Sequence, residues 1–100
     1  MNQVGICAGL SRVQAVADAG ADCVELAAAS TLFPGDGGDA AWAIQRDTLL
    51  ALPVPCETFN LFLPGDFRLV GANPTPPDVL RRYVFTAFRR ARSVGGELIV

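Results

Sequence analysis

Residues 55–66 read PCETFNLFLPGD, and the rest of the chain is organised around this stretch. Pro55 is tolerated as the first residue of a strand, and most of the residues after it are β-branched, aromatic or apolar. The turn signal PGD at 64–66 predicts that a buried strand opens into a long loop. A carboxylate and an amide are costly to bury in such a strand unless something binds them, so Glu57 and Asn60 are candidate site residues.

Apolar runs of strand length alternate with helical patterns along the chain. Strands are expected at 4–8, 23–26, 55–62 and 97–100, and helices at 11–20, 39–52 and 77–94. Ser11, with Gln14 three residues later, predicts a capping box for the first helix, and Asp39 is expected to cap the second. The segments 27–39 and 63–77 hold the Pro and Gly residues typical of loops.

The third predicted helix has the clearest pattern. Its apolar residues recur at i, i+3, i+4 and i+7: Leu80, Tyr83, Val84, Ala87, Phe88, Ala91 and Val94. It also carries five of the eight basic residues: Arg81, Arg82, Arg89, Arg90 and Arg92. These arginines could contact an anionic partner or form a solvent-exposed face of the helix, and we predict the solvent-exposed face. Trp42 and Tyr83 fall on apolar stripes and are expected in the core.

The alternation predicts an α/β fold, βαβαβαβ with parallel strands and right-handed crossovers. Two architectures fit, namely a small doubly wound sheet and the first half of a (β/α)8 TIM barrel. A doubly wound sheet is expected to carry a Gly-rich phosphate loop after its first strand, and GICAG at 5–9 does not match that pattern. We therefore predict that residues 1–100 are the N-terminal part of a barrel domain, truncated in or just after the fourth strand.

Composition narrows the classes of function. A net charge of −2 argues against a nucleic-acid partner. No apolar run approaches the length of a membrane span and no secretory signal is visible, so we expect no membrane contact and a cytoplasmic location. Histidine is absent, so no Ser-His-Asp or Cys-His mechanism can be built from this chain. An odd cysteine count without CxxC spacing predicts that Cys7, Cys23 and Cys56 are small buried hydrophobic residues.

Several segments resemble a known family. VEL at 24–26, after AGAD at 19–22, is similar to the second strand of xylose-isomerase-like TIM barrels. The segment 57–71 resembles the third strand and loop of the sugar-phosphate isomerase/epimerase group within that family. The helix at 80–95, leading into LIV at 98–100, resembles the same group. The resemblance spans nearly the whole chain but only half of the family's fold.

In this family a metal held by carboxylates and a histidine lies at the top of the barrel, and paired glutamates move protons next to a sugar carbonyl. The resemblance therefore implies a divalent metal (Mn, Mg, Co or Zn) in the full-length protein, with its ligands outside this chain. No catalytic or metal-binding residue is carried over. Only Glu25 and Asn60 map near the family's substrate pocket.

Glu25, Glu57 and Asn60 are the predicted substrate-binding residues. Glu25 alternates with Val24 and Leu26, so it faces the barrel interior if they face the helices. Glu57 could face the same interior, where two carboxylates would raise one pKa by repulsion. Asn60 offers a donor and an acceptor to sugar hydroxyls. Each residue also has a purely structural alternative. Glu25 could be a buried carboxylate satisfied by hydrogen bonds, Glu57 could pair with an arginine, and Asn60 could form an Asx-turn that ends the strand.

The expected function is that of a sugar or sugar-phosphate isomerase or epimerase that acts by metal-assisted proton transfer next to a carbonyl, with this chain as its N-terminal part. Its partner would be a small-molecule sugar or sugar phosphate, and a homo-oligomer is compatible with the sequence. One alternative is a phosphodiesterase resembling the family 2 apurinic endonucleases. Such an enzyme is expected to have a wide basic surface at the carboxyl ends of the strands, and Arg68 is the only basic residue of the two long loops. The other alternative is a sugar-binding barrel without catalysis.

Overall fold

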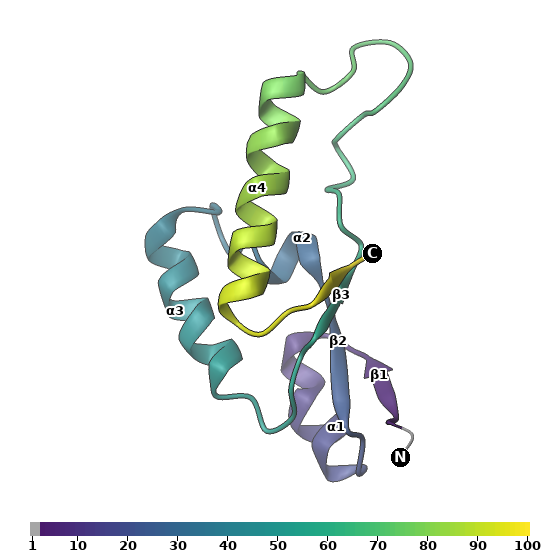
Figure 1. Ribbon diagram of the computed structural model, residues 1–100, viewed down its shortest axis with the longest axis vertical. Coiled ribbons are helices and arrows are strands. Elements are labelled where there is room, and N and C mark those ends of the chain that lie inside the picture. Colours follow the sequence, from purple (N-terminus) through teal and green to yellow (C-terminus); the bar gives the residue numbers. More distant parts are fainter. Residues whose placement is uncertain (1–2) are drawn as a thin grey trace.

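Four parallel strands form one sheet in the order β1-β2-β3-β4 (Figure 1). The computed structural model describes residues 3–100, and its strands are β1 (Gly5–Cys7), β2 (Cys23–Ala27), β3 (Thr58–Asn60) and β4 (Leu98–Ile99). Helices separate successive strands, so the predicted α/β fold with parallel strands is confirmed. Strands that follow their sequence order without a reversal are compatible with part of a (β/α)8 barrel.

The helices lie on one side of this sheet (Figure 1). They are the 3₁₀ helix η1 (Leu10–Arg12), α1 (Val13–Asp18), α2 (Ala28–Thr31), α3 (Asp39–Leu50) and α4 (Pro77–Ser93). The sequence predicts a loop at 27–39, but the first residues of this segment form α2 directly after β2, where alanines favour a helix. Among the helices described, none has the length and apolar character that crossing a bilayer requires.

The predicted caps of the first two helices are wrong. Ser11 lies inside η1 and makes no cap hydrogen bond, while Gln14 donates to the carboxylate of Asp18 at 3.0 Å. Gly38 occupies the N-cap of α3 and Asp39 is its first helical residue. A carboxylate in the first turn still interacts favourably with the positive end of the helix.

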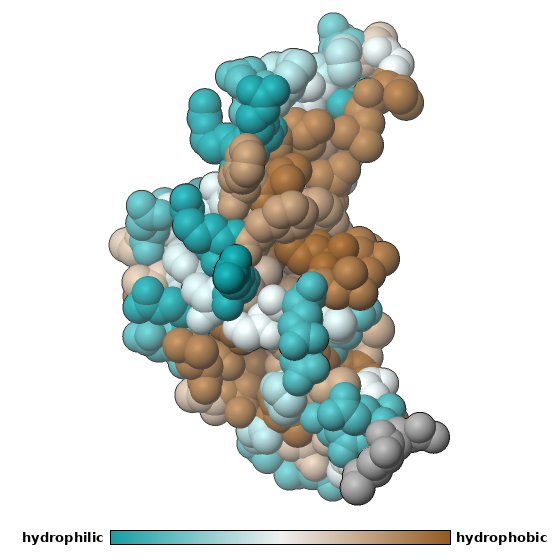
Figure 2. Space-filling model, viewed as in Figure 1, coloured by the Kyte–Doolittle hydropathy of each residue, from teal (hydrophilic) through white to brown (hydrophobic). Residues whose placement is uncertain are grey.

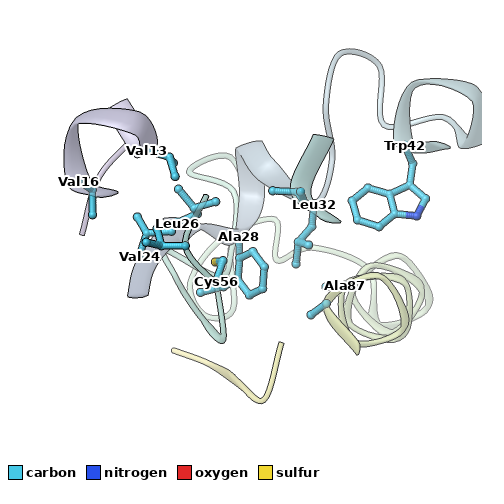
Figure 3. Close-up of a cluster of buried hydrophobic side chains, with 13 residues drawn as sticks. Val13, Val16, Val24, Leu26, Ala28, Leu32, Trp42, Cys56 and Ala87 are labelled. Carbon is cyan, nitrogen blue, oxygen red and sulfur yellow. The ribbon is translucent and has the colours of Figure 1, made fainter. Parts of the chain in front are cut away.

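The core lies between the sheet and the helices (Figure 3). Val24, Leu26 and Phe59 supply the sheet side, and each is at most 1 % exposed. Their partners come from the helices and the residues next to them: Val13, Val16, Ala28, Leu32, Trp42, Leu49, Ala87 and Ala91. Trp42 and Tyr83 are buried, as the sequence predicts. Complete burial of a side chain such as Phe59 contributes about 1.5–3 kcal/mol, so this layer holds the sheet against the helices.

Arg90 contradicts the predicted solvated face of α4. Its side chain is only 4 % exposed. The guanidinium carbon lies 5.1 Å from the ring centroid of Phe33 and 5.2 Å from that of Trp42. The guanidinium donates to the carbonyl oxygens of Leu32 at 2.7 Å and Gly37 at 3.0 Å, and it contacts Asp39 at 3.4 Å. Backbone carbonyls satisfy the buried charge, so Arg90 ties α4 to the segment between α2 and α3. The other four arginines of α4 are exposed.

The strand β3 is shorter than predicted. It ends at Asn60 because Leu61 adopts a left-handed backbone conformation, with φ of 49°, that turns the chain away from the sheet. The Tyr83 hydroxyl then donates to the carbonyl oxygen of Phe62, so α4 fixes the first residues of the loop. No helix or strand interrupts residues 61–76, and the predicted long loop is confirmed.

Within residues 3–100, the sheet has two unpaired edges and one face that no helix covers. Neither β1 nor β4 has a second neighbouring strand within residues 3–100. Figure 2 shows hydrophobic side chains gathered around β4 and the adjacent length of α4. Phe88, Leu98 and Val100 are 52, 56 and 67 % exposed. The face of the sheet opposite the helices carries the polar side chains of the candidate site.

Candidate functional site

Three polar side chains meet on the open face of the sheet, one from each of the first three strands. Asn60 donates from Nδ2 to Glu25 Oε2 at 2.9 Å, and the Cys7 thiol donates to the same oxygen at 3.1 Å. Asn60 Nδ2 also lies 3.6 Å from Cys7 Sγ. We name this group the Cys7–Glu25–Asn60 cluster. It unites two of the three predicted site residues with a cysteine that the sequence did not indicate.

The parallel register brings these side chains together. Glu25 pairs with Cys7 on β1 and with Thr58 on β3, and Asn60 is two residues further along β3. Side chains alternate across a strand, and both neighbours of Glu25 in β2 are buried against the helices. Glu25 therefore points to the open face. Cys7 and Asn60 are the last residues of their strands, so the cluster lies at the carboxyl edge, where parallel α/β sheets bind ligands.

The cluster keeps Glu25 ionised. Hydrogen bonding from the side chains of Cys7, Thr58 and Asn60 lowers the pKa of the Glu25 carboxyl, because each donor favours the charged form. Desolvation acts in the opposite direction and is outweighed. The predicted pair of carboxylates with one raised pKa is therefore wrong for Glu25. A carboxylate that stays charged is suited to accepting hydrogen bonds from a ligand.

Glu25 has the opposite effect on Cys7. The hydrogen bond from the thiol to Glu25, followed by desolvation and the negative charge of Glu25, raises the pKa of Cys7, and Asn60 lowers it by a smaller amount. Cys7 therefore remains a thiol at neutral pH and orients the carboxylate as a donor. Cys7 is exposed, so its prediction as a buried hydrophobic residue is wrong, whereas Cys56 is buried as predicted and Cys23 is half-buried.

Glu57 lies apart from the cluster. It lines a cleft of about 390 Å³ at the amino end of the sheet, between the ends of α3 and α4 and the segment that leads into β3. Its backbone carbonyl accepts a hydrogen bond from the backbone N–H of Glu97 at 2.7 Å. Between residues 3 and 100, no hydrogen bond joins its carboxylate to Glu25 or Asn60. The substrate-binding role of Glu57 stays a prediction from the sequence.

The donor atoms of the cluster do not fit a metal ion. In the described part of the chain, no three or more His, Cys, Asp or Glu side chains are placed to hold one. Cys7 and Glu25 are two such groups, and the thiol proton is engaged in the hydrogen bond between them. A thiol binds a metal well only after losing that proton, which its raised pKa opposes. The cluster itself is therefore assigned no metal.

Comparison with known proteins finds no significant match to a protein-family model, a curated protein or a solved structure. The resemblance to sugar-phosphate isomerases and epimerases therefore stays a prediction from the sequence.

Proposed function

We propose that the Cys7–Glu25–Asn60 cluster binds the hydroxyl groups of a sugar or sugar phosphate, and that the chain forms the substrate-binding part of an isomerase or epimerase. One observation carries the proposal: three polar side chains from three adjacent strands converge at the carboxyl edge of a parallel sheet. In open α/β sheets and in barrels, this edge is where ligands bind. The resemblance of 24–26 and 57–71 to the sugar-phosphate isomerases supports the same class of ligand.

The free atoms of the cluster favour a ligand that donates hydrogen bonds. Cys7 and Asn60 both donate to Oε2 of Glu25, and the side chain of Thr58 also bonds the carboxylate. A carboxylate has about four acceptor sites on its two oxygens, so Oε1 keeps acceptor capacity for a ligand. Asn60 uses its amide nitrogen within the cluster, which leaves its carbonyl oxygen free to accept. Two neighbouring hydroxyls of a sugar can donate to these two oxygens. The phosphate of a sugar phosphate would be repelled by the charged Glu25, so it would lie away from the cluster.

The electrostatics favour a binding role for Glu25 over a proton-transfer role. A general base works best when its pKa lies near the operating pH, and the hydrogen bonds of Glu25 move its pKa in the other direction. Glu25 would then fix the sugar hydroxyls and thereby orient the carbon next to the carbonyl. The groups that move the proton are left unassigned within residues 3–100.

The first test is calorimetric titration of the chain with D-glucose, D-fructose and D-fructose 6-phosphate. We expect at least one of them to bind, and we expect Glu25→Gln and Asn60→Ala each to weaken binding by about tenfold or more, since hydrogen bonds to charged groups contribute about 1.5–3 kcal/mol. Glu57→Gln is the matched control, because Glu57 lines a different cleft. Equal affinity for Glu25→Gln and the unsubstituted chain would remove Glu25 from the site.

A second measurement separates the enzyme from the binding protein. Interconversion of the bound sugar with its isomer or epimer can be followed by proton exchange with deuterated water. Exchange at the carbon next to the carbonyl supports the isomerase or epimerase. Tight binding without exchange shows that this chain by itself binds the sugar without catalysing its conversion, in agreement with the absence of an assigned proton-transfer group within residues 3–100.

A further inference from the structure

A second cavity lies on the helical side of the sheet and shares no residue with the Cys7–Glu25–Asn60 cluster. It has a volume of about 310 Å³ and lies between α4, the segment that leads into α3, and the loop after β3. This volume is at the lower end of the range for cavities that bind small molecules. The cavity is therefore a candidate site that is independent of the proposed sugar-binding function.

Positive charge is concentrated at this cavity. Arg82, Thr86 and Arg89 are four and three residues apart and so lie on one face of α4. The other charged residues of the lining, Arg90 and Asp39, are paired with each other at 3.4 Å. Neither Arg82 nor Arg89 forms a salt bridge within residues 3–100. Two uncompensated guanidinium groups thus face a cavity in a chain whose net charge is −2.

Three aromatic side chains form much of the remaining wall, which Gly37 and Val79 complete. The rings of Phe33 and Tyr83 stack with centroids 4.4 Å apart, and the ring of Phe67 meets Tyr83 edge-on at 5.0 Å. The Tyr83 hydroxyl donates to the carbonyl oxygen of Phe62, so it is engaged within the protein. These rings therefore offer surface for packing, while Arg82, Thr86 and Arg89 on α4 and Asp39 at the start of α3 supply polar groups.

We propose that this cavity binds a phosphate monoester carried on a planar ring. A phosphate dianion has enough oxygens to accept from two guanidinium groups and a hydroxyl at once, whereas a carboxylate is matched by a single guanidinium fork. Arg82 and Arg89 start about 10 Å apart along the helix axis, with Thr86 between them, so their long side chains can converge on one anion. The ring of the ligand packs against Phe67 and Tyr83.

Phenyl phosphate is the probe that tests this proposal. Trp42 is the only tryptophan, its ring lies 5.2 Å from the Arg90 guanidinium, and it lines the neighbouring cleft together with Arg89. Its fluorescence should therefore change as phenyl phosphate binds at constant ionic strength, and calorimetry supplies a second readout. We expect saturable binding that Arg82→Gln and Arg89→Gln each weaken by about tenfold, the loss of roughly one charge-assisted hydrogen bond.

Arg81→Gln is the matched control, because it removes an equal charge from α4 without touching the cavity lining. The substituted side chains are exposed, so thermal unfolding of each variant should match that of the unsubstituted chain. The proposal is overturned if phenyl phosphate shows no saturable binding, or if the double variant Arg82→Gln/Arg89→Gln binds it as tightly as Arg81→Gln does. Equal affinity for inorganic phosphate and phenyl phosphate would show that the ring of the ligand does not contribute to binding, and would overturn that part of the proposal. None of these outcomes depends on whether a sugar binds at Glu25.

Discussion

Arg90 Nη1 lies 2.7 Å from the carbonyl oxygen of Leu32, and this hydrogen bond joins residues 58 positions apart. Leu32 caps the carboxyl end of α2, where backbone carbonyls have no partner within the helix. The other terminal guanidinium nitrogen of Arg90, Nη2, donates to the carbonyl oxygen of Gly37, shortly before α3 begins. One side chain of α4 thereby satisfies the backbone on both sides of the turn between α2 and α3.

Substitution of Arg90 is expected to destabilise the fold. Arg90→Leu would leave the carbonyl oxygens of Leu32 and Gly37 without their buried donor, at a cost of about 2–4 kcal/mol. Urea denaturation followed by circular dichroism measures this loss as a lower midpoint. Arg81→Leu, on the exposed side of the same helix, should leave the midpoint nearly unchanged. Equal midpoints for the two variants would show that the Arg90 contacts contribute nothing net.

The order of the four strands and of α1, α3 and α4 was predictable because βα alternation depends on local patterns. The stripe from Leu80 to Val94 predicts α4 nearly to the residue, and Pro77 marks its start. The burial of Arg90 was not predictable, since it lies next to the apolar stripe and its partners are backbone carbonyls of a distant segment. No side-chain pattern indicates such a partner, and a periodicity argument assigns the arginine to solvent.

Two of the three residues of the Cys7–Glu25–Asn60 cluster were also predictable. The alternation of Glu25 with two buried neighbours placed it on the open face, and the end of β3 placed Asn60 beside it. Cys7 was not predicted because it is an apolar residue type in an apolar run, and only the register of β1 against β2 brings it to Glu25. Glu57 precedes Thr58, the residue that pairs with Glu25, by one position. Successive side chains of a strand point to opposite faces, so Glu57 is not brought to the face that carries Glu25.

The reactivity of Cys7 should report its contact with Glu25. Because the carboxylate raises the pKa of the thiol, Cys7 is expected to react slowly with iodoacetamide at pH 8 despite its exposure. Glu25→Gln removes the negative charge and should accelerate the reaction several-fold, since a change of one pKa unit alters the thiolate fraction about tenfold. Mass spectrometry of the Cys7 peptide gives the rate, with Glu57→Gln as the control. An unchanged rate in Glu25→Gln would contradict the cluster geometry.

In the same measurement Cys56 serves as an internal reference. Burial raises the pKa of Cys56 to about 11, so it should react only after unfolding. A Cys56 that reacts as fast as Cys7 in native buffer would mean that the core opens on the time scale of the experiment.

The pH dependence of sugar binding follows from the lowered pKa of Glu25. Binding requires the carboxylate, which persists from neutral pH down to the folded-state pKa, below the ordinary value of 4.5. Affinity should therefore be constant between pH 7 and pH 5 and should fall as the pH drops through that pKa. Calorimetric titration across this range checks the direction. A loss of affinity already at pH 6 would indicate a group with a raised pKa and would exclude Glu25 as the controlling carboxylate.

Gly96 is expected to be intolerant of a side chain. An added Cβ would lie 2.8 Å from the Phe59 ring and 2.9 Å from the carbonyl oxygen of Ala91, and both neighbours are held in the core. Gly96→Ala should lower stability by about 1–3 kcal/mol through overpacking. At Gly9 an added Cβ meets nothing within 4 Å, so Gly9→Ala is the matched control. Urea midpoints that agree for the two variants would contradict the tight approach of α4 to β3.

Self-association of the 100-residue chain is expected from its open sheet. The edge strand β4 offers unpaired backbone groups beside Leu98 and Val100, which are 56 and 67 % exposed, and such edges pair readily with other strands. Leu98→Lys and Val100→Lys should shift the sedimentation velocity towards that of a monomer, because a charged edge resists strand addition. Ile44→Lys, at a position that is 73 % exposed on α3, should leave the association unchanged. A clean monomer that unfolds cooperatively at high concentration would show that β4 needs no neighbouring strand.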